Sequence, residues 1–73
     1  MTQNERVLDY LRKHGAITPK EAMDELGIMR LGARIYDLKK QGVSITRENV
    51  TEKNRFNEPT TFARYRLEET NAK

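Results

Sequence analysis

The sequence contains no cysteine, no tryptophan, a single histidine and only two prolines in 73 residues. Without cysteine it has no disulfide framework and no thiolate site for zinc or redox chemistry, and one histidine cannot complete a ligand shell for zinc or iron. No apolar run approaches the roughly 20 residues of a membrane span, and residues 1–5 lack the apolar stretch of a signal peptide. We therefore expect one cytoplasmic domain that is not an enzyme, needs no cofactor or metal and does not contact a membrane.

Charged residues are plentiful, and they are unevenly distributed along the chain. Lys and Arg number 14 against 11 Asp and Glu, which gives a net charge of +3. Residues 1–29 carry four basic and five acidic side chains, whereas residues 30–66 carry nine basic and four acidic ones. A neutral first part joined to a basic second part is typical of a protein that meets an anionic partner with one surface. The alternative is a solvated surface whose uneven charge has no functional meaning.

Two helices are marked by capping signals. Residues 2–5 and 18–21 both have the Thr-x-x-Glu spacing of a capping box, and the second also has proline at the first helical position. Gly15 and Gly27 follow the apolar stripes of these helices and can close them in the left-handed conformation. A stub of strand at residues 16–17 separates the two.

A third helix is predicted over residues 29–41. Leu31, Ile35 and Leu38 recur at the spacing of a buried helical stripe. Gly32 lies inside this helix, where glycine costs about 1 kcal/mol relative to alanine. That cost indicates either close packing or the close approach of another molecule to the backbone.

The remaining sequence changes from helical to alternating periodicity. Residues 43–51 and 60–67 alternate apolar and polar side chains and predict two strands. Residues 52–59 between them are polar and predict the loop of an antiparallel hairpin. The domain should therefore cover residues 1–67, with residues 68–73 as a disordered tail.

The order of these elements predicts the fold. Two helices joined by a tight turn are typical of the helix-turn-helix unit, and a hairpin after the second of them forms a wing. The predicted class is α+β, a winged helix-turn-helix with three helices and a C-terminal β-hairpin wing. Two segments, GAITPKEA at residues 15–22 and ARIYDLKKQG at residues 33–42, carry a closer resemblance. Residues 3–67 resemble a helix-turn-helix family that is common in bacteriophages and prophages.

This resemblance implies double-stranded DNA as the partner, in the cytoplasm of a bacterial host. The protein would act as a transcriptional regulator or as an accessory, architectural factor of a phage. Helix 29–41 would lie in the major groove, and the wing, residues 47–64, would hold the backbone or the minor groove.

The candidate DNA contacts are side chains that can read base edges or bind phosphate. On the recognition helix they are Arg30, Ala33, Arg34, Tyr36 and Lys40. Arg30 is the candidate base reader, because a guanidinium can bond both acceptors of guanine. On the wing they are Arg47, Lys53 and Arg55, and at the start of the second helix Thr18 and Lys20 are candidate phosphate contacts.

Several alternatives stay open at this stage. Arg34 could instead form a salt bridge to an acid on the second helix, Glu21 or Glu25. Phe56 could be a wedge inserted into DNA or a partly buried anchor of the loop. The whole domain could be a protein-interaction module, a phage-encoded inhibitor or adaptor, and it could be a monomer or a homodimer. Acidic side chains mixed among the basic ones would favour a protein partner, and acids turned away from them would favour DNA.

Overall fold

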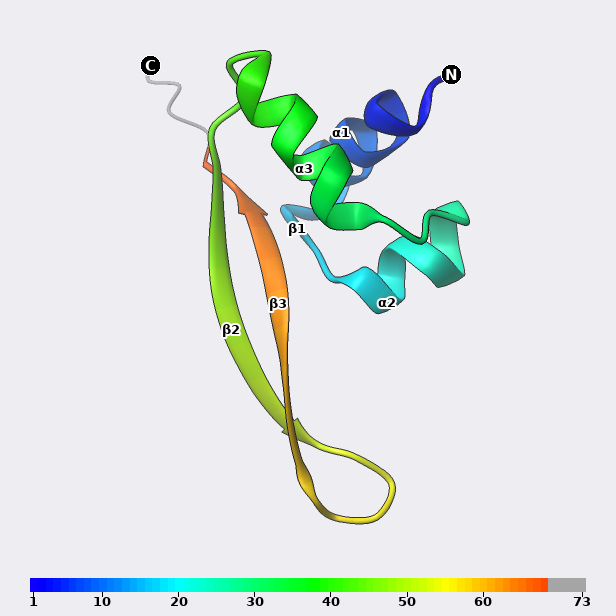
Figure 1. The fold of residues 1–73 in the computed structure, drawn as a ribbon, viewed down its shortest axis with the longest axis vertical. Helices are drawn as coiled ribbons and strands as arrows, with labels where there is room; N and C mark the ends of the chain where they lie inside the picture. Colours follow the sequence, from blue (N-terminus) through cyan, green and yellow to red (C-terminus); the bar gives the residue numbers. More distant parts are fainter. Residues whose placement is uncertain (69–73) are drawn as a thin grey trace.

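The computed structural model describes residues 1–68, which form three helices followed by a long β-hairpin (Figure 1). The elements in chain order are α1 (Gln3–His14), β1 (Ala16–Ile17), α2 (Pro19–Glu21) with its wider π-type continuation η1 (Ala22–Leu26), α3 (Leu31–Lys40), β2 (Ile45–Lys53) and β3 (Pro59–Leu67). The helices gather at one end of a molecule that measures 42 × 27 × 20 Å, and the hairpin extends away from them. The predicted α+β class, with three helices and a C-terminal hairpin, is confirmed.

Both predicted capping boxes are present. The Thr2 hydroxyl accepts the amide of Glu5 at 3.1 Å, and the Glu5 carboxylate accepts the amide of Thr2 at 2.7 Å. Thr18 and Glu21 repeat this exchange at 3.1 and 2.9 Å. The glycines that follow α1 and η1 have φ of 86° and 68°, as left-handed helix caps do. These local signals fix where α1 begins and ends, and where α2 begins and its continuation η1 ends.

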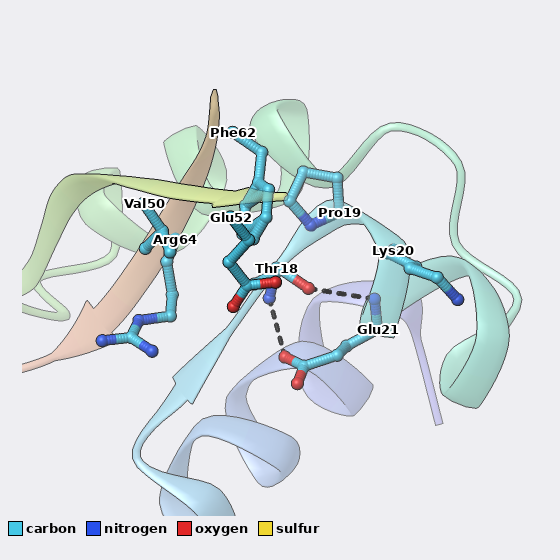
Figure 2. A pocket seen from close by; sticks show the side chains of 8 residues that line it. All are labelled: Thr18, Pro19, Lys20, Glu21, Val50, Glu52, Phe62 and Arg64. Atoms are coloured by element: carbon cyan, nitrogen blue, oxygen red, sulfur yellow. Dashed lines mark hydrogen bonds between the residues drawn. The ribbon is translucent and has the colours of Figure 1, made fainter. Parts of the chain in front are cut away.

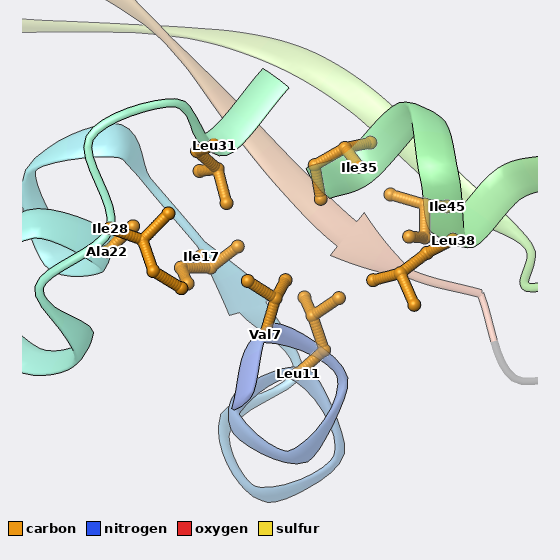
Figure 3. Close-up of a cluster of buried hydrophobic side chains, with 9 residues drawn as sticks. All are labelled: Val7, Leu11, Ile17, Ala22, Ile28, Leu31, Ile35, Leu38 and Ile45. Carbon is orange, nitrogen blue, oxygen red and sulfur yellow. The ribbon is translucent and has the colours of Figure 1, made fainter. Parts of the chain in front are cut away.

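The core is a single cluster of aliphatic side chains between the helices and the base of the hairpin (Figure 3). Its nine members are buried to 7% exposure or less: Val7, Leu11, Ile17, Ala22, Ile28, Leu31, Ile35, Leu38 and Ile45. Tyr65 and Leu67 of β3 pack against this cluster, so the base of the hairpin closes it. Fully burying one such aliphatic side chain contributes about 1.5–3 kcal/mol, which makes this end of the molecule the source of its stability.

The sheet has three antiparallel strands in the order β1-β3-β2. The long pairing of β2 with β3 runs from Ile45 opposite Leu67 to Lys53 opposite Pro59. β1 contributes only two residues, and it places Ile17 opposite Tyr65. Beyond β1 the hairpin therefore continues as a two-stranded ribbon.

The predicted starts of the third helix and of the first hairpin strand were wrong. α3 begins at Leu31, because Arg30 has the non-helical angles φ −113° and ψ 64°. β2 begins at Ile45, because the amide of Val43 donates to the carbonyl of Leu38 at 3.0 Å and closes α3 instead of pairing in the sheet. Met29 and Arg30 consequently lie in the turn before α3.

The hairpin loop is shorter than predicted, and the backbone hydrogen bonds continue to Glu68. Strand pairing continues to Lys53 and Pro59, which leaves residues 54–58 as the loop in place of residues 52–59. The amide of Glu68 donates to the carbonyl of Ser44 at 2.9 Å, so ordered backbone extends at least that far. The rest of the predicted tail, residues 69–73, lies outside the described residues.

Candidate nucleic-acid interface

The outward face of α3 carries a small side chain in its first turn and a basic one at its C-terminal end. Because Leu31, Ile35 and Leu38 are buried, helical spacing turns Ala33, Tyr36 and Lys40 away from the core. The Tyr36 side chain is 62% exposed. The ammonium of Lys40 lies 5.4 Å from the centroid of the Tyr36 ring, which is a cation–π distance.

Gly32 lies on the flank of α3 that adjoins the hairpin. A Cβ built on Gly32 would meet the hydroxyl of Tyr65 at 3.9 Å, an ordinary contact, with no nearer side chain. Close packing therefore does not account for this glycine. Lys39 is exposed and, seven residues along the helix, lies on the same flank.

Arg34 lies on the other flank of α3, against α1. One guanidinium nitrogen donates to Gln3 Oε1 at 3.1 Å, and the other lies 3.2 Å from Asp37 Oδ2. The alternative of a salt bridge with Glu21 or Glu25 was wrong, because the acidic partner of Arg34 is Asp37, three residues along the same helix. This arrangement ties α3 to α1 and directs the carboxylate of Asp37 toward Arg34.

The hairpin has two faces of different charge. Residues opposite each other in an antiparallel pair lie on the same face, and each strand alternates between faces. We call one the basic face, made of Ile45, Arg47, Asn49, Thr51 and Lys53 from β2 with Pro59, Thr61, Ala63, Tyr65 and Leu67 from β3. It carries two cations and no acid, and its base packs against the core beside α3.

The opposite face holds the acids of β2. We call it the clamp face, made of Thr46, Glu48, Val50 and Glu52 from β2 with Thr60, Phe62, Arg64 and Arg66 from β3. The carboxylate of Glu48 accepts Arg64 Nε at 2.7 Å and Arg66 at 3.1 Å. Hydrogen bonds from Arg64 and then Arg66 lower the pKa of Glu48 below its usual 4.5. These two arginines are thus engaged with a carboxylate, which leaves them less available for phosphate.

The loop at the hairpin tip is organised by one side chain. Asn54 Oδ1 accepts the amides of Phe56 at 2.8 Å and Glu58 at 3.1 Å. The backbone adds bonds from the Asn54 amide to the Glu58 carbonyl and from the Asn57 amide to the Asn54 carbonyl, both 2.9 Å. The exposed Arg55 side chain is therefore carried on a fixed turn at the far end of the molecule (Figure 1).

Comparison with protein-family models identifies this arrangement. The family model described as "Winged helix-turn-helix domain" matches residues 2–70. The chain belongs to this winged helix-turn-helix family. The same comparisons found no match to the chain among curated proteins or among solved structures. In the winged-helix domain α3 holds the position of the second helix of the helix-turn-helix unit, for which we keep the name recognition helix, and the β2–β3 hairpin is the wing.

The polar side chains at the start of the second helix already bond to other groups of the winged-helix domain. Thr18 is used in its capping box with Glu21, which brings a carboxylate to the helix start. The ammonium of Lys20 lies 2.7 Å from Asp24 Oδ2. Neither Thr18 nor Lys20 is thus presented as a free phosphate ligand.

A groove of about 470 Å³ separates this helix start from the clamp face of the wing (Figure 2). Pro19, Val50 and Phe62 supply its apolar lining, and both Glu21 and Glu52 stand at it. Lys20 and Arg64 also line it, so two acids and two bases stand at the groove and its charge does not single it out as a phosphate site. The groove also shows that Thr18 and Lys20 face the clamp side of the wing rather than its basic face.

The predicted site residues therefore separate into groups. Arg47 and Lys53 share the basic face, Arg47 near its base and Lys53 next to the loop, with Ala33, Tyr36 and Lys40 on the recognition helix and Arg30 exposed in the turn before it. Arg55 is at the tip, whereas Arg34, Thr18 and Lys20 are held by other contacts. Within residues 1–68, eight Lys and Arg side chains make no salt bridge with any carboxylate: Arg6 and Arg12 on α1, and Arg30, Lys39, Lys40, Arg47, Lys53 and Arg55 in the rest of the chain.

Sequence reasoning missed two parts of this surface. Lys39 was not proposed, although it lies seven residues after Gly32 and so on the same helical flank. The polar residues Asn49 and Thr51 lie between Arg47 and Lys53 on the basic face. Their two-residue spacing from Arg47 was the available signal, because alternate strand residues share a face.

Among residues 1–68, no helix is long and apolar enough to cross a membrane. The same residues contain no group of three His, Asp or Glu side chains that could hold a metal ion.

Proposed function

We propose that this protein binds double-stranded DNA through the recognition helix and the basic face of the wing. The turn residue Arg30 and the outward face of α3 would enter the major groove, and Arg47 and Lys53 would follow the adjoining phosphates. The tip, with Arg55, would reach the backbone or the minor groove. The role we propose is that of a transcriptional regulator or an accessory, architectural factor, in a phage or its bacterial host's cytoplasm, as the family resemblance suggests.

The observation that carries this proposal is the separation of charge on the wing. Glu48 and Glu52 belong to the clamp face, and Asp37 is paired with Arg34 on the far flank of α3. The unpaired cations of α3 and β2 consequently share a surface without these acids. Such a surface favours a polyanion over a protein partner of mixed charge.

The remaining candidate residues take lesser parts in the proposal. Arg34 acts mainly by positioning α3 on α1. Thr18 and Lys20 offer an accessory phosphate contact that requires the Lys20–Asp24 pair to open. Ala33 lies where a thymine methyl could contact it.

The first test is a fluorescence titration of the protein with a random-sequence duplex between about 50 and 200 mM salt. If four or five phosphates are neutralised, log K should fall against log salt with a slope of about −4, or roughly 250-fold over this range. Absence of binding at ~50 mM salt would contradict the proposal, because non-specific affinity is almost entirely electrostatic.

A second test separates base reading from backbone contact. Once a preferred site is selected from a random pool, R30A should weaken binding to that site more than to random duplex. R55A should weaken binding to all sequences alike and reduce the salt slope by about 1. Equal and uniform losses from both variants would count against Arg30 as the base reader.

A protein partner is the second candidate function, favoured by the exposed apolar side chains Met29, Tyr36 and Phe56, at 79%, 62% and 73% exposure. Phe56 belongs to the wing tip, at the opposite end of the molecule from α3, so the three do not form one patch (Figure 1). Retained partner capture by R47Q, a variant that should lose DNA affinity, would favour this function.

The stoichiometry on DNA would distinguish a monomer from a homodimer, whose half-sites would be about one helical turn apart.

A further inference from the structure

Phe56 is a large apolar side chain placed where the protein cannot bury it. Its side chain is 73% exposed at the tip of the wing. The interpretation of Phe56 as a partly buried loop anchor was therefore wrong. An aromatic ring normally contributes through burial, and at this position burial requires another molecule.

The loop holds its shape without the Phe56 ring. Its fixed geometry comes from Asn54, whose side chain accepts the amides of Phe56 and Glu58, and from the left-handed Asn57 at φ 63°. The backbone is paired again at Lys53 and Pro59, directly beside the loop. The ring is thus presented on a rigid support, and little ordering entropy remains to be lost when it meets a partner.

The tip of the wing lies far enough from α3 to meet a second groove of the DNA, and it carries a positive charge beside Phe56. A nine-residue strand rises about 30 Å, and the wing extends away from α3 along a molecule 42 Å long. Half a turn of DNA, the spacing between neighbouring grooves, is about 17 Å. Arg55 directly precedes Phe56 and makes no salt bridge within residues 1–68, and arginine is favoured in the strongly negative potential of a narrow minor groove.

We propose that Phe56 is a wedge that enters a base step from the minor groove and kinks the bound duplex. This inference rests on the proposed DNA binding and specifies its geometry. Apolar side chains that enter the minor groove unstack a base step and bend the duplex by about 20–90° toward the major groove. Pyrimidine–purine steps such as TA unstack most easily, so the wedge selects flexible steps without hydrogen bonding to their bases.

The test uses two duplexes labelled at their ends for energy transfer. One consists of alternating TA steps with 2-aminopurine in place of several adenines, so that the wedge finds a flexible step in any register. The other is an A-tract with the same substitutions. At ~50 mM salt the wild-type protein should raise 2-aminopurine fluorescence and bring the ends of the alternating duplex closer together. Both changes should be much smaller on the A-tract.

The variant F56A should keep its cationic contacts and its fold, since the lost side chain is exposed. We expect it to bind the alternating duplex about fivefold or more weakly, by analogy with the loss of one base–aromatic contact, and to abolish both the fluorescence rise and the bend. F56L should retain part of the bend, because leucine also serves as a wedge. M23A is the matched control: Met23 is 51% exposed on η1, far from the wing tip, and its loss should change none of these readings.

The outcomes separate this inference from the proposed function. Binding by the wild-type protein without unstacking or bending would overturn the wedge and leave DNA binding intact. The wedge would also be overturned if F56A bent and unstacked the duplex as the wild type does. Absence of any binding by the wild-type protein at ~50 mM salt would instead overturn the proposed function itself.

Discussion

The two faces of the wing are built from the same two strands, yet they differ in what their charges can do. On the basic face, Arg47 and Lys53 stand among neutral residues and have no carboxylate partner within residues 1–68. On the clamp face, Glu48 holds Arg64 and Arg66. Both faces carry two cations, so the number of basic residues does not distinguish them. The faces differ because only the cations of the clamp face are bound to a carboxylate.

This difference shows why the charge of a strand segment is a poor guide to its function. The antiparallel register assigns each residue to a face, and a shift of one residue would move every acid of β2 to the opposite side. The register is fixed at the base of the wing, where Ile45 and Tyr65 pack into the core. The hydrophobic core thus determines which charges face the partner.

Charge reversal on the basic face should have the largest effect. Each charged hydrogen bond to phosphate contributes about 1.5 kcal/mol, so R47E/K53E should weaken binding to random duplex by roughly 100-fold or more at ~50 mM salt. The exposed positions should leave the melting temperature close to that of the wild type. Unchanged affinity, with the fold verified by circular dichroism, would show that this face does not meet DNA.

A comparison at equal net charge should give a smaller and more specific effect. R47Q removes one positive charge, and E48Q/R64Q/R66Q also lowers the net charge by one, since it removes two positive charges and one negative charge. If the faces differ as proposed, R47Q should reduce affinity roughly tenfold and the salt slope by about 1, whereas the triple variant should change affinity less than twofold. Equal losses would mean that only total charge matters.

The local structure could largely be predicted from the sequence, because its causes are local. Two Thr-x-x-Glu capping boxes, the glycine caps and the stripe of Leu31, Ile35 and Leu38 all depend on residues within a few positions of each other. The faces of the wing were only partly predictable. Alternation of side chains indicates which residues share a face, but which face adjoins α3 depends on the tertiary packing that places the Tyr65 hydroxyl near Gly32.

Contacts between distant segments were the least predictable part. The alternative to a DNA contact for Arg34 was a partner on the second helix, but the packing of α3 against α1 brings Gln3 within reach, 31 residues away in the sequence. The sequence likewise left Phe56 open between a wedge and a partly buried anchor, and only the structure shows that its side chain is exposed.

Substitution of Gly32 tests whether DNA contacts the boundary between the recognition helix and the basic face. We expect a moderate effect on DNA affinity. It has no positive φ and has space for a Cβ, so G32A should raise the free energy of unfolding by up to about 1 kcal/mol. If DNA backbone approaches α3 there, affinity should nevertheless fall several-fold. Thermal unfolding without DNA and titration with random duplex measure the two effects separately. A more stable variant with unchanged affinity would place Gly32 outside the interface.

The smallest expected effect concerns the clamp face and pH. Because Arg64 and Arg66 lower the pKa of Glu48 in the folded state, the stability they add is present above the unfolded pKa of about 4.5 and is lost as pH falls through the lowered folded pKa. The melting temperature of the wild type should therefore decrease more between pH 7 and pH 3 than that of E48Q. Glu5, whose pKa its bonds with Thr2 lower as well, contributes equally to both proteins and cancels in the difference. E52Q removes a charge from the same face without touching the arginines, and it should follow the wild type. Because Glu48 and its two arginines are partly exposed, the difference in melting temperature should be small. Identical dependence of the melting temperature on pH in the wild type and E48Q would mean that Glu48 does not hold Arg64 and Arg66 in solution. The two faces would then differ less than their geometry indicates.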